Sequence, residues 1–245
     1  MKTEIIKVEN LEAAFDGKRI LKGVSFTAYQ NEITVILGTS GCGKTTLMKH
    51  LIGLYKVDLG RVYILGQRTD TMDEDEFEQF QLNMGVLFQN GALLNSLTVA
   101  DNISIALEQH VKIPVDMIRD LVRVKLKLVG LSHAIDYLPD QLSGGMLKRA
   151  ALARAIAMDP VLLFCDEPSA GLDPVTLKGL DQLFLQLKEQ LGISIVLVTH
   201  EVSSIKRLAD RIIYLEKGHV LFQGSLQDAL DSNIPEIKNF FNNGN

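Results

Sequence analysis

The residues best suited to chemistry form one glycine-rich segment, Gly38-Thr39-Ser40-Gly41-Cys42-Gly43-Lys44-Thr45-Thr46. Its first eight residues match the pattern G-x-x-x-x-G-K-[ST], in which glycines let backbone N–H groups turn inward around a phosphate chain. In this pattern Lys44 reaches the β- and γ-phosphates and the Thr45 hydroxyl binds Mg²⁺. Cys42 occupies a variable position, so its thiol is incidental. The segment therefore predicts an ATP site over residues 38–46, and the alternative is a glycine-rich turn without a ligand.

Two acids follow an apolar run later in the chain. Val161–Cys165 predicts a buried strand, and Asp166 and Glu167 come directly after it. Ligands of parallel α/β sheets bind beyond the carboxyl ends of the strands. Asp166 is placed to hold Mg²⁺ through its water shell, and Glu167 can activate the water that attacks the γ-phosphate. An acid pair alone could be a helix cap, but its presence beside a phosphate loop favours catalysis.

A second helix start with free N–H groups occurs at Leu142-Ser143-Gly144-Gly145-Met146. Ser143 is a good helix cap, and the two glycines expose backbone N–H groups at the start of an alanine-rich helix. This segment is a second anion site in a chain that already has one. Two such sites per chain make sense if ATP is held between two chains arranged head to tail.

The remaining pattern predicts the elements that position these residues. Ile33–Leu37, Val161–Cys165 and Ile193–Val198 are apolar on both faces, which is typical of parallel strands with helices between them. Residues 5–8 and 20–26 predict two further strands around a turn at residues 16–17, and Leu47, Leu51 and Leu54 predict one face of a helix. The sequence thus indicates an α/β fold with a parallel sheet.

A helical segment interrupts this core between residues 97 and 141. Thr98 and Asp101 have the capping-box spacing, and Pro114 and Gly130 can open and close a second helix. We therefore predict a single domain, 1–245, made of a nucleotide-binding core (1–96 and 142–245) and a helical subdomain (97–141). Residues 71–78 predict a solvated turn or helix start, and the tail after Gly224 predicts one short helix.

Composition limits the partners of the chain. The net charge of −5 disfavours broad nucleic-acid binding, which depends on basic residues that neutralise phosphates. No apolar run approaches the ~18 residues of a membrane span, and residues 1–10 lack the core of a signal peptide. We expect a cytoplasmic chain whose membrane contact is indirect. Its two cysteines, Cys42 and Cys165, are expected to be reduced and unpaired.

Taken together, these motifs resemble those of the ABC ATPases, because Leu142–Met146 is similar to the LSGGQ signature of that family. The resemblance covers about residues 5–224. It implies a P-loop NTPase core of the ABC type with an N-terminal antiparallel β region and a helical subdomain. It also implies a homodimer, with ATP and Mg²⁺ as cofactors, in which the signature of one subunit faces the γ-phosphate bound to the other.

The same resemblance assigns the remaining site residues. Phe15 matches the aromatic residue that stacks on adenine, and His200 matches the switch histidine at the end of a strand. Gln89 matches the Gln loop, which contributes to the metal site with Thr45 and Asp166 and begins the groove that receives a permease. The dimer-contact loop is Ser169-Ala170-Gly171-Leu172-Asp173. Two positions depart from the family pattern, with Met146 in place of Gln and Glu201 in place of Asp.

Two longer segments are similar to a narrower group within the family. Residues 146–155 and 88–99 resemble the ATPases of MCE-type lipid transporters, including the Mla phospholipid system of bacterial envelopes. This similarity implies phospholipid or lipid transport, with an integral-membrane permease and an MCE-type substrate-binding protein as separate chains. The ATPase would then lie on the cytoplasmic face of the inner membrane.

Three other functions are also to be compared with these motifs. A soluble ABC ATPase that assembles complexes, such as the iron–sulfur type, is the main alternative, and only its partners distinguish it. A translation-factor ABC protein is disfavoured because such chains carry two ATPase halves. A nucleotide sensor that does not hydrolyse ATP is disfavoured because Lys44, Asp166 and Glu167 are all present.

Replacing Lys44 with Ala should reduce ATP binding below detection, because this ammonium is the cation expected on the β- and γ-phosphates. Equilibrium binding of a fluorescent ATP analogue measures the effect. Met146→Gln is the matched control and should preserve ATPase activity, since the Met side chain supplies no donor to phosphate. An unchanged ATP affinity in the Lys44 variant would contradict the assignment.

Overall fold

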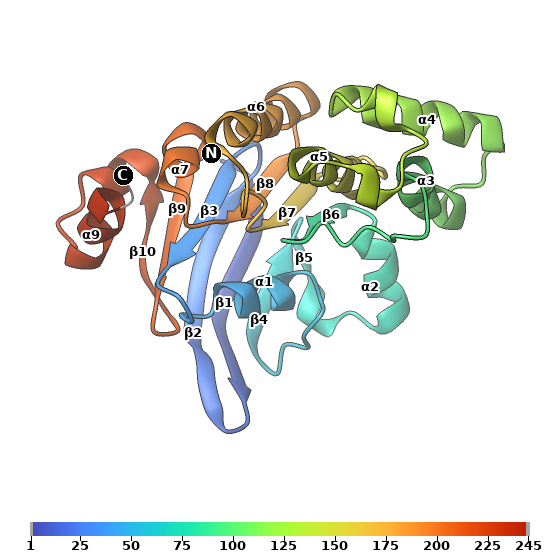
Figure 1. The fold of residues 1–245 in the computed structure, drawn as a ribbon. Helices are drawn as coiled ribbons and strands as arrows, with labels where there is room; N and C mark the ends of the chain where they lie inside the picture. The colour runs from blue at the N-terminus through green and yellow to red at the C-terminus, as the bar shows by residue number, and fades with distance from the viewer. Residues whose placement is uncertain (1, 244–245) are drawn as a thin grey trace.

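The computed structural model describes residues 2–243 of the chain, which contain two β-sheets and the helices around them (Figure 1). The larger sheet has the order β10-β9-β3-β8-β7-β6, in which β6, β7, β8, β3 and β9 run parallel and β10 pairs antiparallel with β9. Its strands are β3 (Ile33–Gly38), β6 (Met84–Leu87), β7 (Leu162–Asp166), β8 (Ser194–Val198), β9 (Arg211–Glu216) and β10 (His219–Ser225). The predicted parallel α/β core is confirmed.

The smaller sheet is antiparallel and has the order β2-β1-β4-β5, which confirms the antiparallel region implied by the resemblance. Its strands are β1 (Glu4–Phe15), β2 (Lys18–Tyr29), β4 (Leu59–Ile64) and β5 (Gln67–Arg68). The turn between β1 and β2 lies at Asp16 and Gly17, whose positive φ angles of 49° and 75° suit a tight hairpin. The strands extend beyond the two predicted runs because they pair along nearly their whole length.

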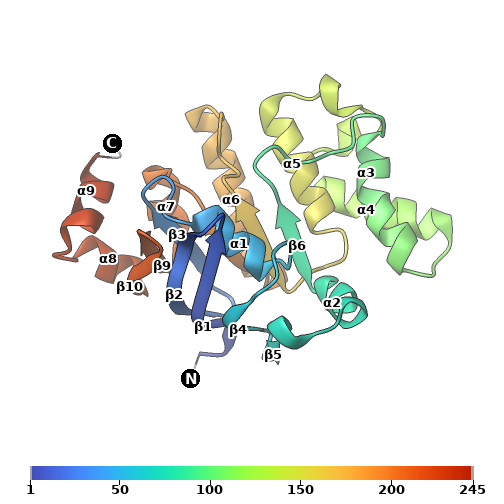
Figure 2. The same ribbon diagram turned by 90° about the horizontal axis from the view of Figure 1, so that it is seen from below.

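Helices and the antiparallel sheet cover the two faces of the parallel sheet (Figures 1 and 2). On one face, α1 (Lys44–Leu51) and the antiparallel sheet share an apolar cluster with Ile36, Phe164 and Val196. On the other face lie α5 (Gly144–Ala155), α6 (Pro174–Leu191) and α7 (Val202–Leu208). Successive residues of a strand point to opposite faces, so apolar side chains are needed at every position.

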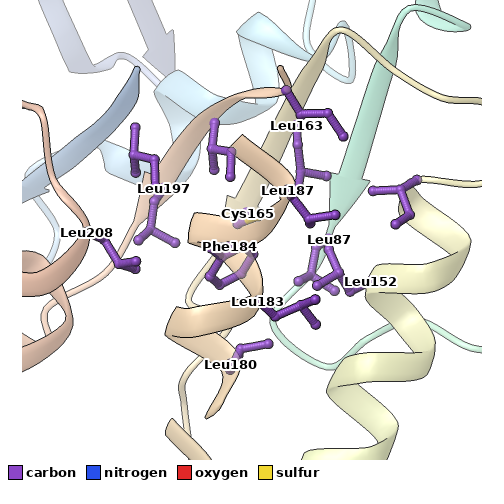
Figure 3. Close-up of a cluster of buried hydrophobic side chains, with 14 of the residues drawn as sticks. Leu87, Leu152, Leu163, Cys165, Leu180, Leu183, Phe184, Leu187, Leu197 and Leu208 are labelled. Atoms are coloured by element: carbon purple, nitrogen blue, oxygen red, sulfur yellow. The ribbon is translucent and has the colours of Figure 1, made fainter. Parts of the chain in front are cut away.

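The core on the helical face is drawn in Figure 3. Phe184 of α6 is 1% exposed, and around it gather side chains from three strands and three helices. The labelled members besides Phe184 are Leu87, Leu152, Leu163, Cys165, Leu180, Leu183, Leu187, Leu197 and Leu208. Complete burial raises the pKa of the Cys165 thiol well above its ordinary value, and the charge of Asp166 adds to the shift. Cys165 is therefore a packing residue, and both cysteines are free, as predicted.

Two helices occupy the segment predicted as a helical subdomain, α3 (Val99–His110) and α4 (Val115–Leu128), and no strand occurs in it. Thr98 accepts a hydrogen bond from the Asp101 amide, and the Asp101 carboxylate accepts one from the Thr98 amide, which confirms the predicted capping box. Pro114 stands at the start of α4. Short 3₁₀ helices at Ser132–Ala134 and Pro139–Gln141 lead back to α5. The division at residues 97 and 141 stays a prediction.

Several local predictions were incomplete or wrong. Leu54 lies beyond the end of α1 and is 56% exposed, because the helix stops at Leu51. The tail contains two helices, α8 (Leu226–Leu230) and α9 (Pro235–Asn243), instead of one. The acidic segment at 71–78 was predicted correctly as a solvated turn or helix start, because a 3₁₀ turn at 69–71 leads into the exposed first turn of α2 (Glu74–Gln81). Strands β4, β5, β6, β9 and β10 were not predicted individually. Among residues 2–243, no helix combines the length and apolar character that a membrane span requires.

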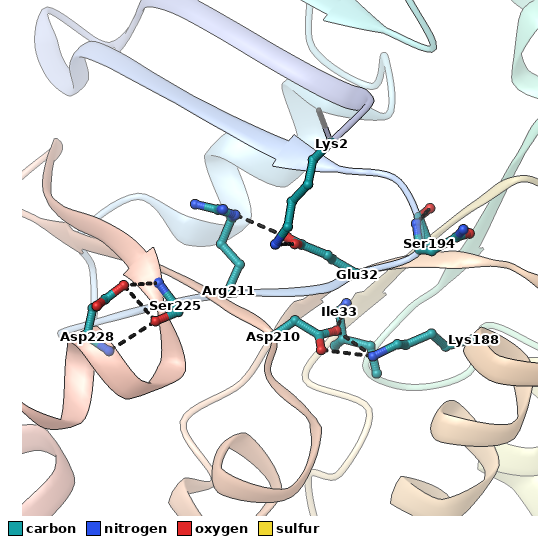
Figure 4. Close-up of polar contacts among 10 residues, drawn as sticks. Lys2, Glu32, Ile33, Lys188, Ser194, Asp210, Arg211, Ser225 and Asp228 are labelled. Carbon is teal, nitrogen blue, oxygen red and sulfur yellow. Dashed lines mark hydrogen bonds and ion pairs between the residues drawn. The ribbon is translucent and has the colours of Figure 1, made fainter.

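Polar contacts hold together the amino ends of the parallel strands, at the edge opposite the motifs (Figure 4). At the start of β3, the Ile33 amide donates to Asp210, which also pairs with Lys188 of α6 at 2.7 Å. The adjacent Glu32 pairs with Arg211 of β9 at 3.2 Å and with Lys2. These contacts stabilise the strand order at the amino ends of the parallel strands, whereas the motifs lie at the carboxyl ends.

Replacing Phe184 with Ala should lower the free energy of unfolding by about 3–5 kcal/mol, because the substitution leaves a cavity in a closed core. Urea unfolding measures the loss as a shifted midpoint with an unchanged slope. Val175→Ala on the same helix is the control, since Val175 is 82% exposed and should change stability by less than ~0.5 kcal/mol. Equal losses in both variants would contradict this description of the core.

Candidate functional site

The glycine-rich segment lies between the carboxyl end of β3 and the first turn of α1. Gly38 has φ 147°, and a Cβ atom there would lie 2.0 Å from the Leu215 carbonyl oxygen, so only glycine fits. Gly43 precedes α1 with φ 111° and provides no side-chain cap. The first N–H groups of α1 are therefore left for a ligand, and the positive end of the helix dipole favours an anion.

Lys44 folds back over this segment. Its Nζ donates to the carbonyl oxygens of Gly38 at 2.9 Å and Thr39 at 3.0 Å. The Thr39 hydroxyl in turn donates to the Glu216 carboxylate at 3.0 Å. Ser40 and Thr45 are exposed and Thr46 is half-buried. The ammonium and these hydroxyl groups thus surround the open helix start.

Cys42 differs from its neighbours in the segment because its side chain is buried. Burial raises the pKa of the Cys42 thiol, and the charge of Lys44 opposes this shift. A thiol kept neutral in this way is a weak nucleophile. Its position agrees with a packing role for the side chain.

Asp166 is the last residue of β7, the strand that pairs with β8, and Glu167 follows it. Asp166 Oδ1 is buried and accepts no hydrogen bond from the described residues, whereas the buried Glu167 Oε2 lies 3.0 Å from His200 Nδ1. Burial raises the pKa of the Asp166 carboxyl, the charge of Glu167 raises it further, and Lys49 and Lys44 oppose the shift. Buried carboxylate oxygens without partners are costly unless a cation binds them.

The unpartnered Asp166 oxygen fits a magnesium ion. Residues 2–243 contain no cluster of three His, Cys, Asp or Glu side chains placed to hold a metal by themselves. Mg²⁺ characteristically takes one or two protein oxygens and completes its shell with water and nucleotide phosphates. Asp166 and the Thr45 hydroxyl are suitable protein groups for such a site.

Glu167 contacts the predicted switch histidine. His200 lies two residues beyond β8, is exposed, and its Nδ1 is 3.0 Å from Glu167 Oε1. The Glu167 backbone has φ 45°, a left-handed conformation that is strained for a non-glycine residue without a short polar side chain. Its amide donates to the Val198 carbonyl at 2.8 Å, which holds the strained turn against β8. The sequence placed both residues at strand ends but did not predict their contact.

The signature begins α5, as predicted. Ser143 is the helix cap and accepts a hydrogen bond from the Met146 amide at 3.3 Å. Ser143 and Gly144 are exposed, and a Cβ atom on Gly144 would meet nothing within 4 Å. Leu142 and Met146 pack against the core. Among the hydrogen bonds of residues 2–243, none joins this helix start to the phosphate loop of the same chain.

The predicted dimer-contact loop lies beside the signature. Asp173 caps α6 by accepting from the amides of Val175 and Thr176 at 3.0 and 3.1 Å, which lowers its pKa together with the Thr176 hydroxyl contact. A Cβ atom on Gly145 would lie 2.4 Å from Thr176 Cγ2, so the two helix starts are closely packed. Ser169 contacts Thr199 at 3.4 Å, Leu172 packs on the core, and Ala170 and Gly171 complete the loop.

Phe15 lies at the tip of the β1–β2 hairpin and is 41% exposed. Its ring is 5.1 Å from that of Tyr55, at an interplanar angle of 54°. Tyr55 accepts from Lys49 at 3.3 Å and was missed from the sequence, because no motif marks it. The part of β2 next to the turn lies near the phosphate loop, since a Cβ atom on Gly43 would be 2.8 Å from Leu21 Cδ2. The ring is thus available for stacking, and its role with a base stays a prediction.

Gln89 is exposed in the turn after β6, at the same edge of the sheet as the phosphate loop and the acid pair. Two residues of α5 that the sequence did not single out hold this turn. Lys148 donates to the Gln89 carbonyl, and Arg154 donates to the carbonyls of Gly91 at 2.9 Å and Ala92 at 2.6 Å. Both cations lie on the signature helix, and no spacing rule connects them to a turn more than fifty residues away.

The sequence that forms this site matches a known protein family. Residues 21–170 match the family described as ABC transporter, which is more than half of the chain. The chain belongs to the ABC transporter family. The prediction that it is an ABC-type ATPase is confirmed, and so is the fold class.

Individual relatives are similar to this chain, hereafter called the cassette, over nearly its whole length. The intermembrane phospholipid transport system ATP-binding protein MlaF of Escherichia coli is 36% identical over 236 residues, which are 96% of this chain and 88% of MlaF. The probable ribonucleotide transport ATP-binding protein mkl of Mycobacterium tuberculosis is 38% identical over 97% of this chain, and the cassette spans 66% of that relative's length. The predicted resemblance to the Mla group is therefore confirmed.

Solved structures agree with these relatives. CbiO1 of Clostridium perfringens, part of the ABC transporter complex CbiONQ, superposes with a TM-score of 0.86 at 31% identity and covers 94% of this chain and 92% of its own. The ATP-binding cassette MJ0796 in a dimeric post-hydrolysis state bound to ADP and phosphate gives a TM-score of 0.83 at 30% identity, covering 91% and 99%. The cassette thus shares its fold with nucleotide-binding subunits.

Replacing Asp166 with Asn should stabilise the metal-free cassette. A carboxyl whose pKa is raised on folding destabilises the native state above that folded pKa, and this penalty disappears as the pH falls through it. At pH 8 the variant should melt at a higher temperature than the parent, and the rise should be small because water screens the charge of this half-buried carboxyl. The gain should shrink on acidification. A melting temperature lowered at pH 8 would contradict the unpartnered carboxylate.

Proposed function

We propose that the cassette hydrolyses ATP between two copies of the chain and that this cycle drives a separate membrane permease. The observation that carries the proposal is the pair of open anion sites in one chain. The phosphate loop and the Ser143-Gly144-Gly145 helix start both expose N–H groups, and among residues 2–243 no hydrogen bond connects the two sites. A head-to-tail dimer gives the second site a phosphate to bind. The dimeric MJ0796 cassette supports this arrangement.

In the proposed site each residue acts on one part of ATP. Lys44 exchanges its contacts with Gly38 and Thr39 for the β- and γ-phosphates, and Phe15 stacks on the base. Residues 38–46 surround the phosphates with backbone N–H groups. Thr45, Asp166 and Gln89 are the groups that would hold Mg²⁺, which neutralises phosphate charge when bound.

The carboxylate of Glu167 accepts the proton of the attacking water. His200 holds this carboxylate through its Nδ1, 3.0 Å away, and can present its other ring nitrogen to the γ-phosphate. The strained Glu167 backbone fixes the carboxylate at the end of β7, so that little reorganisation is needed during the reaction. The partner's signature and the loop 169–173 would close the site against bulk water.

We further propose lipid, most specifically phospholipid, as the cargo class. Support comes from the names of the MlaF relatives and from the similarity of residues 88–99 and 146–155 to that group. The mycobacterial relative is named for ribonucleotide transport, so the name of one relative does not decide the cargo. The partners would be an integral-membrane permease contacting the groove near residues 89–97 and an MCE-type protein. The cassette would then lie on the cytoplasmic face of the inner membrane.

Replacing Glu167 with Gln should preserve ATP binding and accumulate a closed dimer, because the variant lacks the base but keeps the phosphate loop. Turnover should fall by about 10²–10⁴-fold. Gel filtration with light scattering in Mg·ATP measures the dimer. Glu189→Gln, an exposed carboxylate on α6, is the control and should neither slow turnover nor trap a dimer. Monomers alone in ATP would contradict the sandwich.

Transport itself is tested by the partners of the wild-type chain. Purification of a tagged cassette in detergent should recover a multi-span membrane protein in stoichiometric amount if the chain drives a permease. Recovery of only water-soluble assembly factors would favour the soluble complex-assembling ATPase. Stimulation of ATPase activity by phospholipid vesicles containing that permease would support the cargo class.

A further inference from the structure

The turn after β6 is bound to the signature helix along most of its length. We use the name Gln turn for residues 89–92. At the strand before it, a Cβ atom on Gly85 would lie 2.2 Å from the Ala155 carbonyl oxygen, so β6 presses on the end of α5 (Figure 2). In the turn itself, a Cβ atom on Gly91 would lie 3.1 Å from Leu147 and 3.2 Å from Ala151. Gly91 also has φ 73°, a left-handed backbone that favours glycine, so a larger residue there would be strained and would press on α5.

Two cations complete the contact. Lys148 is 6% exposed and donates to the Gln89 carbonyl, while Arg154 reaches Gly91 and Ala92 with its two terminal nitrogens. Neither cation pairs with a carboxylate in any ion pair of residues 2–243. A buried ammonium without a counter-ion depends on its hydrogen bonds, because leaving them unmade carries the full cost of desolvation. These two cations therefore hold the turn more firmly than apolar packing would.

The backbone of the turn is strained in the form that the cations hold. Ala92 has φ 52°, in the left-handed region that a non-glycine residue rarely adopts. Burial also lowers the pKa of both Lys148 and Arg154, as expected for cations withdrawn from water. The strained turn and the two desolvated cations stabilise each other, so the assembly has one preferred geometry.

We infer that Lys148 and Arg154 are positioning residues that make the Gln turn and the signature helix one rigid body. At one end of this body Gln89 faces the nucleotide site of its own chain, and at the other end Ser143 begins the helix that serves the partner. The inference rests on the proposed function, in which each chain binds one nucleotide at its own phosphate loop and contacts the nucleotide of its partner through its signature. Binding at Gln89 then sets the position of Ser143, which couples the two sites.

The test is hydrogen exchange during ATP titration in the Glu167→Gln background. In the parent, peptides covering residues 89–95 and 142–149 should become protected at the same ATP concentration. In Lys148→Met, protection of 142–149 should require about tenfold more ATP than protection of 89–95, within the 5–150-fold range typical of coupling between sites. ADP affinity should stay within about twofold, because the phosphate loop is untouched.

Lys125→Met is the matched control. Lys125 is also a buried lysine, 3% exposed, but its hydrogen bond goes to Asp159 and not to the Gln turn. Its two protection curves should coincide. Lys148→Arg should restore coincidence by replacing the donor. If Lys148→Met does not fold, Arg154→Lys provides the same test, since it keeps the charge but loses the two-pronged contact.

Each outcome has one meaning. Coincident curves in Lys148→Met, or equal separation in Lys125→Met, would overturn the positioning role and leave the sandwich dimer intact. Separation confined to Lys148→Met or Arg154→Lys, with rescue by Lys148→Arg, would support it. If the parent shows no ATP-dependent protection of 142–149, the sandwich dimer itself fails, and the inference fails with it.

Discussion

Apolar burial of the parallel sheet on both faces is the constraint from which the site follows. Ile36 and Phe164 face α1 and the antiparallel sheet, while Val35 and Leu163 face the opposite layer of helices, so these strands have no side free for chemistry. Polar groups can appear only where the strands end. The amino ends carry paired ions such as Lys188 and Asp210, and the carboxyl ends carry the buried Asp166 Oδ1, which accepts no hydrogen bond from the described residues. Stability and chemistry are thereby assigned to opposite edges of one sheet.

The carboxyl edge is kept ready for a ligand at a cost to the fold. The first N–H groups of α1 have no side-chain cap, the buried Asp166 Oδ1 accepts no hydrogen bond from the described residues, and Glu167 has a left-handed backbone. Each of these features destabilises the ligand-free chain, and each is relieved or used when a phosphate and a cation bind. The surrounding core supplies the stability of the domain. The charged groups of the site can therefore be held in place before a ligand binds.

The signature helix α5 connects several of the predicted functional segments. Ser143 caps the start of α5, Lys148 lies in its middle, and its end packs against β6. The helix therefore contains part of the exposed signature and also contacts the Gln turn. Gly145 also packs on Thr176 beside the dimer-contact loop. A displacement of this helix would therefore reach three predicted functional segments at once. This contiguity gives a physical basis for coupling nucleotide binding to a partner subunit.

The sequence by itself determined whatever depends on neighbours along the chain. The phosphate loop, the acids after β7, the Ser143 and Thr98 caps and the buried strands are local patterns, because backbone geometry and capping involve residues within a few positions. Only the tertiary structure decided which distant groups meet: His200 with Glu167, Tyr55 with Phe15, and Lys148 and Arg154 with the Gln turn. Edge strands such as β6 also escaped prediction, since four residues carry too little periodicity. Contacts of this kind depend on how helices and strands pack across the sheet, and the spacing of residues along a chain does not encode that packing.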